Sequence, residues 1–425
     1  MMTRDDLPGM PRNSPLPGSQ TPSKTGYRWE EALQFHRHFD LAKWPGEGEA
    51  ARFAYLMTPE LFPHAWIHRA GPIAELAFSP LETVGEIRTQ TYLGTLKLDE
   101  YVQSAPIDGF LVLHRGRIVY ERYPRLRPFD KHIWWSVSKA VVALVVALLE
   151  DRGLVDVRRP IETYLPELAG SDWRGTPILD ILDMASGMTG LESDDPEAYT
   201  NPSSPYGRYE GSLGMQPRTA DTPASTYDYI PRLTRQKPSG QVFEYTSVNT
   251  FVLSWLAEKL TDTPFPELVS REIWRKIGAE SDALHLVSAI GAPATHGTIN
   301  STLRDMARFG LLFTPSWGIV CRERLVSDVY LKKIQKGGRP DVFVKGSAAQ
   351  ALTAAAGEQP RHNTYQWDFV LEDGDFYKGG FMGQMLYVSP SRDLIVTAFA
   401  TGTEGDALAN IANARALAKS GLFAA

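Results

Sequence analysis

The chain has 425 residues, and its 44 Lys and Arg nearly balance its 50 Asp and Glu, which argues against a nucleic-acid-binding protein with a concentrated basic face. Its one cysteine, Cys321, excludes an intramolecular disulfide and a cysteine-based metal cluster. Its longest apolar run, Ala140–Leu149, has ten residues, about half of what a membrane span needs, so we expect a cytoplasmic protein without a membrane partner.

The first half of the chain begins with an arm and leads to a hairpin and a buried helix. Residues 1–26 are rich in proline and glycine and predict an extended or disordered arm, without the apolar core of a secretory signal. Phe110–Leu113 and Ile118–Tyr120 flank Arg115-Gly116-Arg117, a pattern typical of a β-hairpin. Ser136–Asp151 is apolar nearly all round, as expected of a helix inside the protein.

The second half predicts helices followed by strands. Helices are expected at Ile178–Met184, Val252–Leu260 and Leu303–Phe313, with a long loop over residues 187–226. Strands are expected at Gln366–Leu371, Met385–Val388 and Leu394–Ala400, before a last helix at Ala407–Ser420. Strands at both ends and helices between them predict an α+β fold. Its sheet domain would consist of residues 27–135 and 290–425, and its mainly helical domain of residues 136–289.

Ser136 is the candidate nucleophile. Among 27 serines it is the only one with a lysine, Lys139, three positions later, and residues so spaced share a helix face. A serine hydroxyl needs a base to remove its proton, and the apolar run after Lys139 would keep the amine neutral by burying it. The alternative is that Ser136 or Ser138 caps the helix. Neither serine has the Glu or Gln of a capping box, and a lysine in the first turn opposes the helix dipole.

Two later segments carry further candidate groups. Tyr245, with Ser247 and Asn249 after it, precedes an apolar helix and would deliver a proton to a leaving group; the alternative is a core tyrosine beside a helix cap. Lys378-Gly379-Gly380-Phe381 precedes a predicted strand, and glycines there let backbone approach a ligand closely. The N–H groups of Ser136 and Phe381 would then form an oxyanion hole; the alternative is a plain glycine-rich turn.

In this order and spacing, the three elements resemble the serine β-lactamase and penicillin-binding protein superfamily. The similarity is closest to the branch of 6-aminohexanoate-dimer hydrolase and the β-lactamase-like esterases of family VIII. It covers residues 109–422 and includes Tyr164–Ser171, Leu182–Met184, Phe243–Thr250, Arg304–Gly310 and Gly383–Gln384. The resemblance implies a β-lactamase-like α+β fold, with an antiparallel sheet flanked by helices and an inserted mainly helical domain, and it implies no cofactor.

The resemblance also implies roles for single residues. Ser136 would be acylated, Lys139 would be its base, Tyr245 would shuttle the proton, and the N–H groups of Ser136 and Phe381 would bind the oxyanion. The substrate would contact Trp135, Asp194, Ser247, Asn249, His296, Lys378, Gly379 and Gly380. A literal Lys24-Thr25-Gly26 precedes the nucleophile and lies in the proline-rich arm, so it is not taken as the family's K-T-G strand.

Two departures from the family bear on the substrate. Lys378-Gly379-Gly380 lacks the hydroxyl residue with which a β-lactamase holds its substrate's carboxylate. Asp194 stands where nylon-oligomer hydrolases carry a tyrosine that assists the amide nitrogen, with Tyr199, Tyr206 and Tyr209 as substitutes after an apparent insertion. We therefore expect a carboxylesterase for small esters ahead of an amidase for small linear or cyclic amides, and a β-lactamase or D-aminopeptidase third. A non-catalytic penicillin-binding-like sensor is the alternative from a different class.

Weaker signals concern metals and partners. His64 and His68 would share a helix face and bind a metal there, but no carboxylate stands at a known offset, so we expect packing or surface roles and no metal. The acidic cluster Asp194–Glu197 would attract an amino-bearing substrate or form a solvated loop. The expected partner is a small ester or amide and no nucleic acid, with a homodimer left open.

Overall fold

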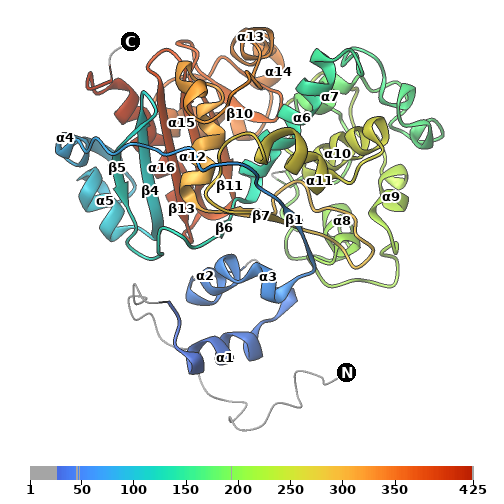
Figure 1. Cartoon of the computed structure of the whole chain (residues 1–425). Coiled ribbons are helices and arrows are strands. Elements are labelled where there is room, and N and C mark those ends of the chain that lie inside the picture. The colour runs from blue at the N-terminus through green and yellow to red at the C-terminus, as the bar shows by residue number, and fades with distance from the viewer. Residues whose placement is uncertain (1–25, 45, 47, 193, 424–425) are drawn as a thin grey trace.

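The computed structural model describes residues 26–44, 46, 48–192 and 194–423. Its largest sheet has seven antiparallel strands in the order β5-β4-β13-β12-β11-β10-β9 (Figure 1). They are β4 (Ile107–His114), β5 (Arg117–Arg122), β9 (His362–Thr364), β10 (Trp367–Val370), β11 (Phe376–Gly380), β12 (Gln384–Ser389) and β13 (Leu394–Ala400). Because β4 pairs with β13, segments almost 300 residues apart in the sequence lie next to each other in one sheet. The arm expected at residues 1–26 lies, apart from Gly26, outside the described residues.

The predicted hairpin is confirmed by β4 and β5. Its two turn residues, Arg115 and Gly116, both have positive φ angles, of 50° and 69°. A two-residue turn of this kind matches the right-handed twist of the paired strands. The three strands expected near the C-terminus are present as β10, β12 and β13.

Two helices cover opposite faces of this sheet. Along β4, Leu111 and Leu113 belong to the core cluster that contains α12 (Leu303–Leu311), whereas Phe110 and Val112 belong to the cluster that contains α16 (Glu404–Lys419). Successive residues of a strand point to opposite faces, so the alternation places one helix on each side. This arrangement of helices on an antiparallel sheet confirms the predicted α+β class.

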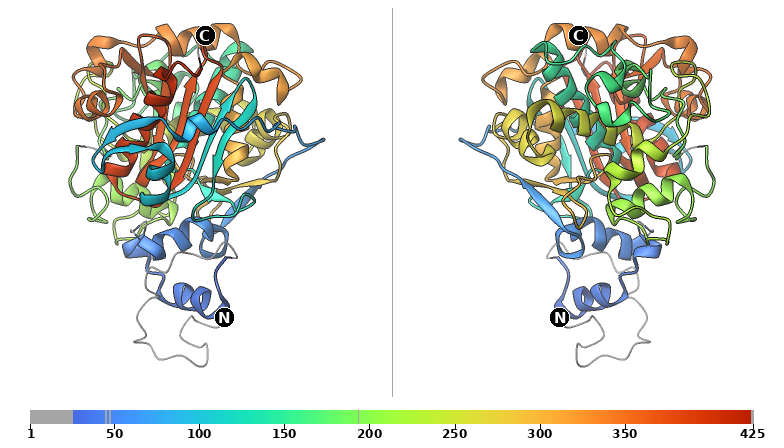
Figure 2. Two further views of the ribbon diagram at one scale, coloured as in Figure 1. Left: turned by 90° about the vertical axis from the view of Figure 1, so that its left-hand side faces the viewer. Right: turned by 90° about the vertical axis from the view of Figure 1, so that its right-hand side faces the viewer.

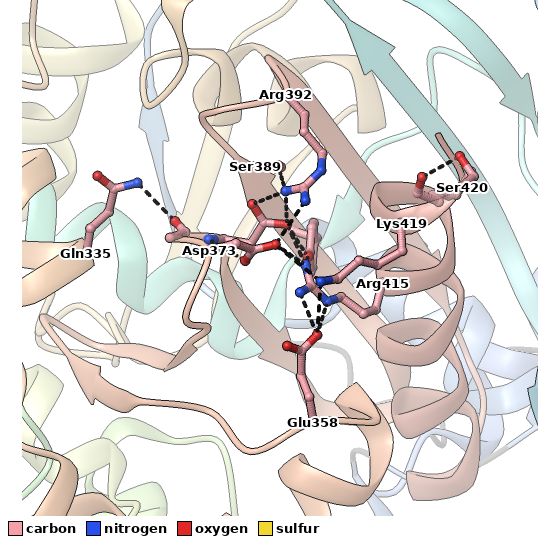
Figure 3. A network of polar contacts seen from close by, with 12 residues as sticks. Gln335, Glu358, Asp373, Ser389, Arg392, Arg415, Lys419 and Ser420 are labelled. Atoms are coloured by element: carbon pink, nitrogen blue, oxygen red, sulfur yellow. Dashed lines mark hydrogen bonds and ion pairs between the residues drawn. The ribbon is translucent and has the colours of Figure 1, made fainter. Parts of the chain in front are cut away.

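A network of ion pairs joins α16 to the turn between β10 and β11 (Figure 3). Arg415 Nη1 lies 2.9 Å from carboxylate oxygens of both Asp373 and Asp375. Arg392, which follows β12, contacts the same two carboxylates at 3.0 and 3.1 Å. Because the Asp375 side chain is wholly buried, these guanidinium groups compensate a charge that water cannot reach.

The helical part is built around α6 (Lys139–Asp151) and α10 (Ser247–Thr261), which pack against each other. The apolar pattern predicted α6, and its residues from Lys139 to Leu149 are all buried. Around them lie α7 (Ile178–Leu182), α8 (Pro205–Leu213), α9 (Thr226–Tyr229) and α11 (Phe265–Val269).

The segment 187–226 is not a continuous loop, as the sequence had led us to expect, because it contains α8. Ser204 accepts a hydrogen bond from Gly207 N at 2.9 Å and caps the helix, Pro205 occupies its first turn, and Gly214 ends it with φ 78°. Proline and glycine made this stretch resemble a loop, although both fit a helix at these positions. Gly207 also lies so close to the preceding chain that a Cβ would come within 2.3 Å of Asn201 O.

The molecule has a second sheet, with three N-terminal helices beneath it. The sheet has the order β1-β7-β8-β6, with β1 (His64–Ile67), β6 (His132–Ile133), β7 (Ala283–Leu286) and β8 (Ile299–Ser301). The N-terminal helices α1 (Trp29–His38), α2 (Gly48–Leu56) and α3 (Thr58–Leu61) lie beneath it in all views (Figure 2). His64 lies on strand β1, so the helical spacing considered for His64 and His68 does not occur. Strand β7 lies within residues 136–289, the proposed helical domain, and yet it pairs with β1 of the other proposed domain. The domain division stays a prediction.

The remaining elements are α4 (Glu82–Gly85), β2 (Arg88–Thr91), β3 (Gly94–Lys97), α5 (Leu98–Ser104), α13 (Asp328–Lys336), α14 (Pro340–Phe343) and α15 (Ala348–Ala356). None of the described helices combines the length and the apolar character needed to cross a bilayer.

Candidate active site

Ser136 lies in a 3₁₀ turn, Trp135–Ser138, that leads directly into α6. The residue before it, Trp135, has φ 46°, a left-handed conformation that costs a bulky residue about 1–3 kcal/mol and is concentrated at functional sites. Ser138 occupies the capping position of α6 without a side-chain cap bond, and its hydroxyl accepts a hydrogen bond from Ile299 N instead. The alternative that either serine caps the helix is therefore wrong.

Lys139 is wholly buried, and its amine contacts three oxygens. Its Nζ donates to Ser136 Oγ at 2.8 Å, to Ser247 Oγ at 3.0 Å and to His296 O at 2.8 Å. Burial lowers the pKa of Lys139 to about 7, although the charge of the Glu192 carboxylate acts in the opposite direction and raises it. A lysine with this pKa is substantially neutral at neutral pH and is able to accept the proton of Ser136.

Tyr245 belongs to the same group of side chains, with its ring centre 5.1 Å from the amine of Lys139. Burial, followed by the charge of Asp368, raises the pKa of Tyr245 well above 10, although the neighbouring Ser136 acts to lower it. Lys378 is wholly buried behind it and lies between the Tyr245 hydroxyl, at 3.2 Å, and the Asp368 carboxylate. The phenol therefore stays protonated over the ordinary pH range, with a cation held beside its oxygen.

Gly380 places the end of β11 against the turn of the nucleophile. A Cβ at Gly380 would lie 2.5 Å from Trp134 O and 3.1 Å from Trp135 Cβ, so only glycine fits. Phe381 follows at once, in a short turn whose next residue, Met382, has φ 61°. The segments that carry the N–H groups of Ser136 and Phe381 are thus in contact, and their joint action as an oxyanion hole stays a prediction.

A small pocket of about 30 Å³ opens on Ser136. Most of its wall is aromatic or otherwise apolar, and the rest consists of Ser136, two carboxylates, a histidine and an amide. Its lining residues are Trp44, Trp135, Ser136, Glu192, Tyr199, Tyr206, Glu210, Met215, Gln216, His296 and Phe381.

Both carboxylates of the pocket are buried and held by contacts. Glu192 accepts a hydrogen bond from Ser247 N and another, at 3.0 Å, from the hydroxyl of Tyr199. Glu210 lies 2.9 Å from His296 Nε2, and Nδ1 of the same ring contacts Tyr209 at 3.0 Å. Since His296 O also accepts from Lys139, this side of the pocket is connected to the base.

The residues expected to contact substrate divide into two groups. Trp135 and His296 line the pocket, and Ser247 contacts the lysine. Ser247 and the remaining residues are not among the lining residues. The buried Asn249 contacts Met184 with its amide, and Gly379 donates its N–H to Asp368. Lys378 donates to the Tyr245 hydroxyl, and Gly380 lies against the carbonyl oxygen of Trp134.

Asp194, also expected at the substrate, is exposed and does not line the pocket. The chain is held at the pocket by Glu192, leaves it through a turn in which Asp195 accepts from Glu197 N, and returns with Tyr199. Tyr199 and Tyr206, considered as substitutes for Asp194 from the sequence, do line the pocket.

Sequence reasoning missed Trp44, Glu192, Glu210, Met215 and Gln216. None of them belongs to a motif with fixed spacing. Their part in the pocket follows from tertiary contacts alone, such as the bond between Glu192 and Ser247 N.

The comparisons with known proteins agree with this geometry. The sequence profile of the Beta-lactamase family matches residues 97–419. The 6-aminohexanoate-dimer hydrolase of Paenarthrobacter ureafaciens is 30% identical over 357 residues, which covers 84% of this chain and 86% of the relative.

Solved structures share the fold. A Bacillus anthracis protein assigned as a 6-aminohexanoate-dimer hydrolase superimposes with a TM-score of 0.69 and 22% identity, over 84% of this chain and 89% of its own. EstCE1, a hydrolase with promiscuous acyltransferase activity, has a TM-score of 0.56 and 14% identity, over 75% of this chain and 95% of its own. With a family profile over most of its length and a relative at 30% identity, the chain belongs to the Beta-lactamase family and is a serine hydrolase of amide or ester bonds.

Proposed function

We propose that this protein cleaves small carboxylic amides, and esters by the same route, through an acyl-enzyme on Ser136. The observation that carries the proposal is the wholly buried amine of Lys139, 2.8 Å from Ser136 Oγ. A neutral amine at this distance activates a hydroxyl that is otherwise a weak nucleophile.

Acylation would begin with attack of Ser136 Oγ on the substrate carbonyl carbon while Lys139 takes the hydroxyl proton. The carbonyl oxygen becomes an oxyanion, which the N–H groups of Ser136 and Phe381 would stabilise. The bond to the amine or alkoxide then breaks, and Tyr245 gives that leaving group its proton. The proton on Lys139 returns to the phenolate, so Tyr245 is restored.

Deacylation would use the same groups in reverse order. Water replaces the leaving group, Tyr245 passes its proton to Lys139, and the resulting phenolate takes the proton of the water as it attacks the acyl carbon. The bond to Ser136 Oγ then breaks, Lys139 returns its proton to that oxygen, and the carboxylic acid is released. The contact between Lys139 and Ser247 Oγ, at 3.0 Å, keeps the amine oriented while Ser136 is acylated.

Amide cleavage is placed ahead of ester cleavage because of Tyr199. The expectation of an esterase rested on Asp194 in place of a tyrosine, but Asp194 is exposed and Tyr199 lines the pocket. The Tyr199 hydroxyl is held by Glu192, and its ring packs 5.4 Å from that of Phe381. A phenol beside the nucleophile suits an amide, whose nitrogen must be oriented and protonated to leave. The 30% identical relative is named for hydrolysis of an amide dimer, which supports the same order.

A β-lactamase or D-aminopeptidase activity is ranked third. Lys378, the cation that would hold a substrate carboxylate, is wholly buried and already paired with Asp368.

One panel tests the proposal: kcat/KM for 6-aminohexanoate dimer, p-nitrophenyl butyrate, a D-amino-acid amide and nitrocefin, with Ser136→Ala as the control. Turnover of the dimer and the ester, both lost in Ser136→Ala, is the expected result. Turnover of the ester with no turnover of the dimer would restore the esterase as first choice. A single acylation without steady-state turnover of any substrate would favour the sensor.

A further inference from the structure

The N-terminal helical segment, residues 29–62, contributes one of its described residues to the pocket. The segment lies outside residues 97–419, which carry the family profile, yet its Trp44 lines the wall beside Ser136. Trp44 is only 5% exposed and stands between α1 and α2. The pocket is therefore incomplete without this segment.

Trp44 is fixed from one side by aromatic rings of its own segment. Its ring centroid lies 6.2 Å from that of Phe39, 5.7 Å from that of Tyr55 and 5.0 Å from that of Phe62. Aromatic pairs at such distances contribute about 0.5–1.5 kcal/mol each beyond the area they bury. The indole is thus a rigid surface rather than a loose side chain.

On the other side, Trp44 packs on the residue that precedes the nucleophile. Its ring lies 5.2 Å from that of Trp135, and Trp135 in turn lies 5.7 Å from Phe381. The ring of Tyr199 lies 5.4 Å from that of Phe381. Ser136 consequently faces a small pocket, of about 30 Å³, with these contacting aromatic rings in its wall.

We infer that Trp44 is a specificity-determining residue that binds the apolar chain next to the scissile carbonyl and selects slim, unbranched aliphatic chains. The inference rests on the proposed function, since it assumes a carbonyl held at Ser136. Flat rings bury methylene groups without offering them a polar partner. The small pocket has no room for a branch at the carbon next to the carbonyl, and the further methylene groups of a longer chain would leave it along the ring of Trp44. Each methylene buried against such a wall raises kcat/KM by about fourfold, the equivalent of 0.8 kcal/mol.

The test compares unbranched p-nitrophenyl esters, acetate to hexanoate, with the branched pivalate, in the wild type, Trp44→Ala and Trp44→Phe. In the wild type, kcat/KM should rise from acetate to hexanoate and be lowest for pivalate. In Trp44→Ala, hexanoate should lose on the order of tenfold or more through KM, acetate about threefold or less, and pivalate should gain. Trp44→Phe, which keeps a ring and serves if the alanine variant is unstable, should fall between them.

The matched control is Trp29→Ala, in the same segment, because Trp29 is 73% exposed and does not line the pocket. Its chain-length profile should equal that of the wild type. An equal loss on acetate and hexanoate in Trp44→Ala would mean that Trp44 only supports the turn at Trp135, and an unchanged profile would mean that it does not meet substrate; either overturns the inference.

A binding measurement separates this inference from the proposed function. Calorimetric titration of hexanamide and acetamide into Ser136→Ala and into Trp44→Phe/Ser136→Ala measures how tightly the chain binds beside Trp44 in proteins that lack the nucleophile. Tighter binding of hexanamide that weakens in the double variant supports the role of Trp44 even if no ester or amide is turned over. Equal binding of the two amides contradicts that role, whatever the hydrolytic activity.

Discussion

The amine of Lys139 lies 2.8 Å from the hydroxyl oxygen of Ser136, and the lysine side chain has no exposed surface. Burial disfavours the ammonium form, and the pKa of Lys139 falls to about 7. Glu192, whose carboxylate accepts the N–H of Ser247, acts in the opposite direction and raises that pKa. The ability of Lys139 to act as a base is thus set chiefly by burial, with Glu192 as the largest opposing influence.

The first prediction concerns pH. Lys139 accepts a proton only when neutral, so kcat/KM should rise as pH increases through about 7 and then level off. Replacing Glu192→Gln removes the charge that favours the ammonium form, so the rise should move to lower pH. Glutamine has nearly the same shape and its oxygen is able to accept the N–H of Ser247. The measurement is kcat/KM from pH 5 to 9 for both proteins, and a shift to higher pH would contradict this account.

The second prediction concerns the nucleophile. Ser136→Ala should lower kcat by on the order of 10⁴-fold or more, with the fold intact, because its hydroxyl serves chemistry rather than packing. Ser138→Ala is the matched control: it removes the acceptor of Ile299 N, so it should lower stability by about 1–3 kcal/mol and keep most of the activity. The measurements are kinetics and thermal unfolding of both variants. An inactive Ser138→Ala together with an active Ser136→Ala would show that Ser136 is not the nucleophile.

Local patterns were enough to predict much of the sheet and of the nucleophile's surroundings. Arg115-Gly116 between two short apolar runs predicts a tight hairpin, and the apolar run of residues 140–149 predicts a buried helix. Ser136 and Lys139 were found because the three-residue spacing brings them together within one turn, whatever the rest of the fold does.

Residues that reach the site through tertiary contacts could not be predicted in this way. Trp44 precedes Ser136 by 92 positions and lines the same pocket only because the N-terminal segment packs against Trp135. Asp194 was placed at the pocket by counting residues, but the bond between Glu192 and Ser247 N fixes the chain earlier and leaves Asp194 outside. Counting along a chain fails where a buried contact sets the path of the loop.

The third prediction distinguishes amides from esters. Tyr199→Phe removes the hydroxyl that Glu192 holds in the pocket, so kcat/KM should fall more for an amide than for an ester of the same acyl group, by about tenfold or more. The ring remains, so its packing on Phe381 is kept. Asp194→Asn, an exposed change on the same loop, should leave both rates within about twofold. Equal losses on the two substrates in Tyr199→Phe would show that the hydroxyl does not act on the leaving nitrogen.

The last prediction concerns the contact between β11 and the nucleophile's turn. In Gly380→Ala, the new Cβ would lie 2.5 Å from the carbonyl oxygen of Trp134, which is backbone and has little freedom to move. The end of β11 must then shift away and carry the N–H of Phe381 with it, so kcat should fall by about 10²–10³-fold, as when an oxyanion-hole donor is lost. Gly405→Ala is the control, because a Cβ there meets no atom closer than 3.5 Å and alanine favours a helix. Kinetics on one ester, with thermal unfolding to confirm that Gly380→Ala is folded, gives the answer. A folded Gly380→Ala with wild-type kcat would show that Phe381 N–H takes no part in binding the oxyanion.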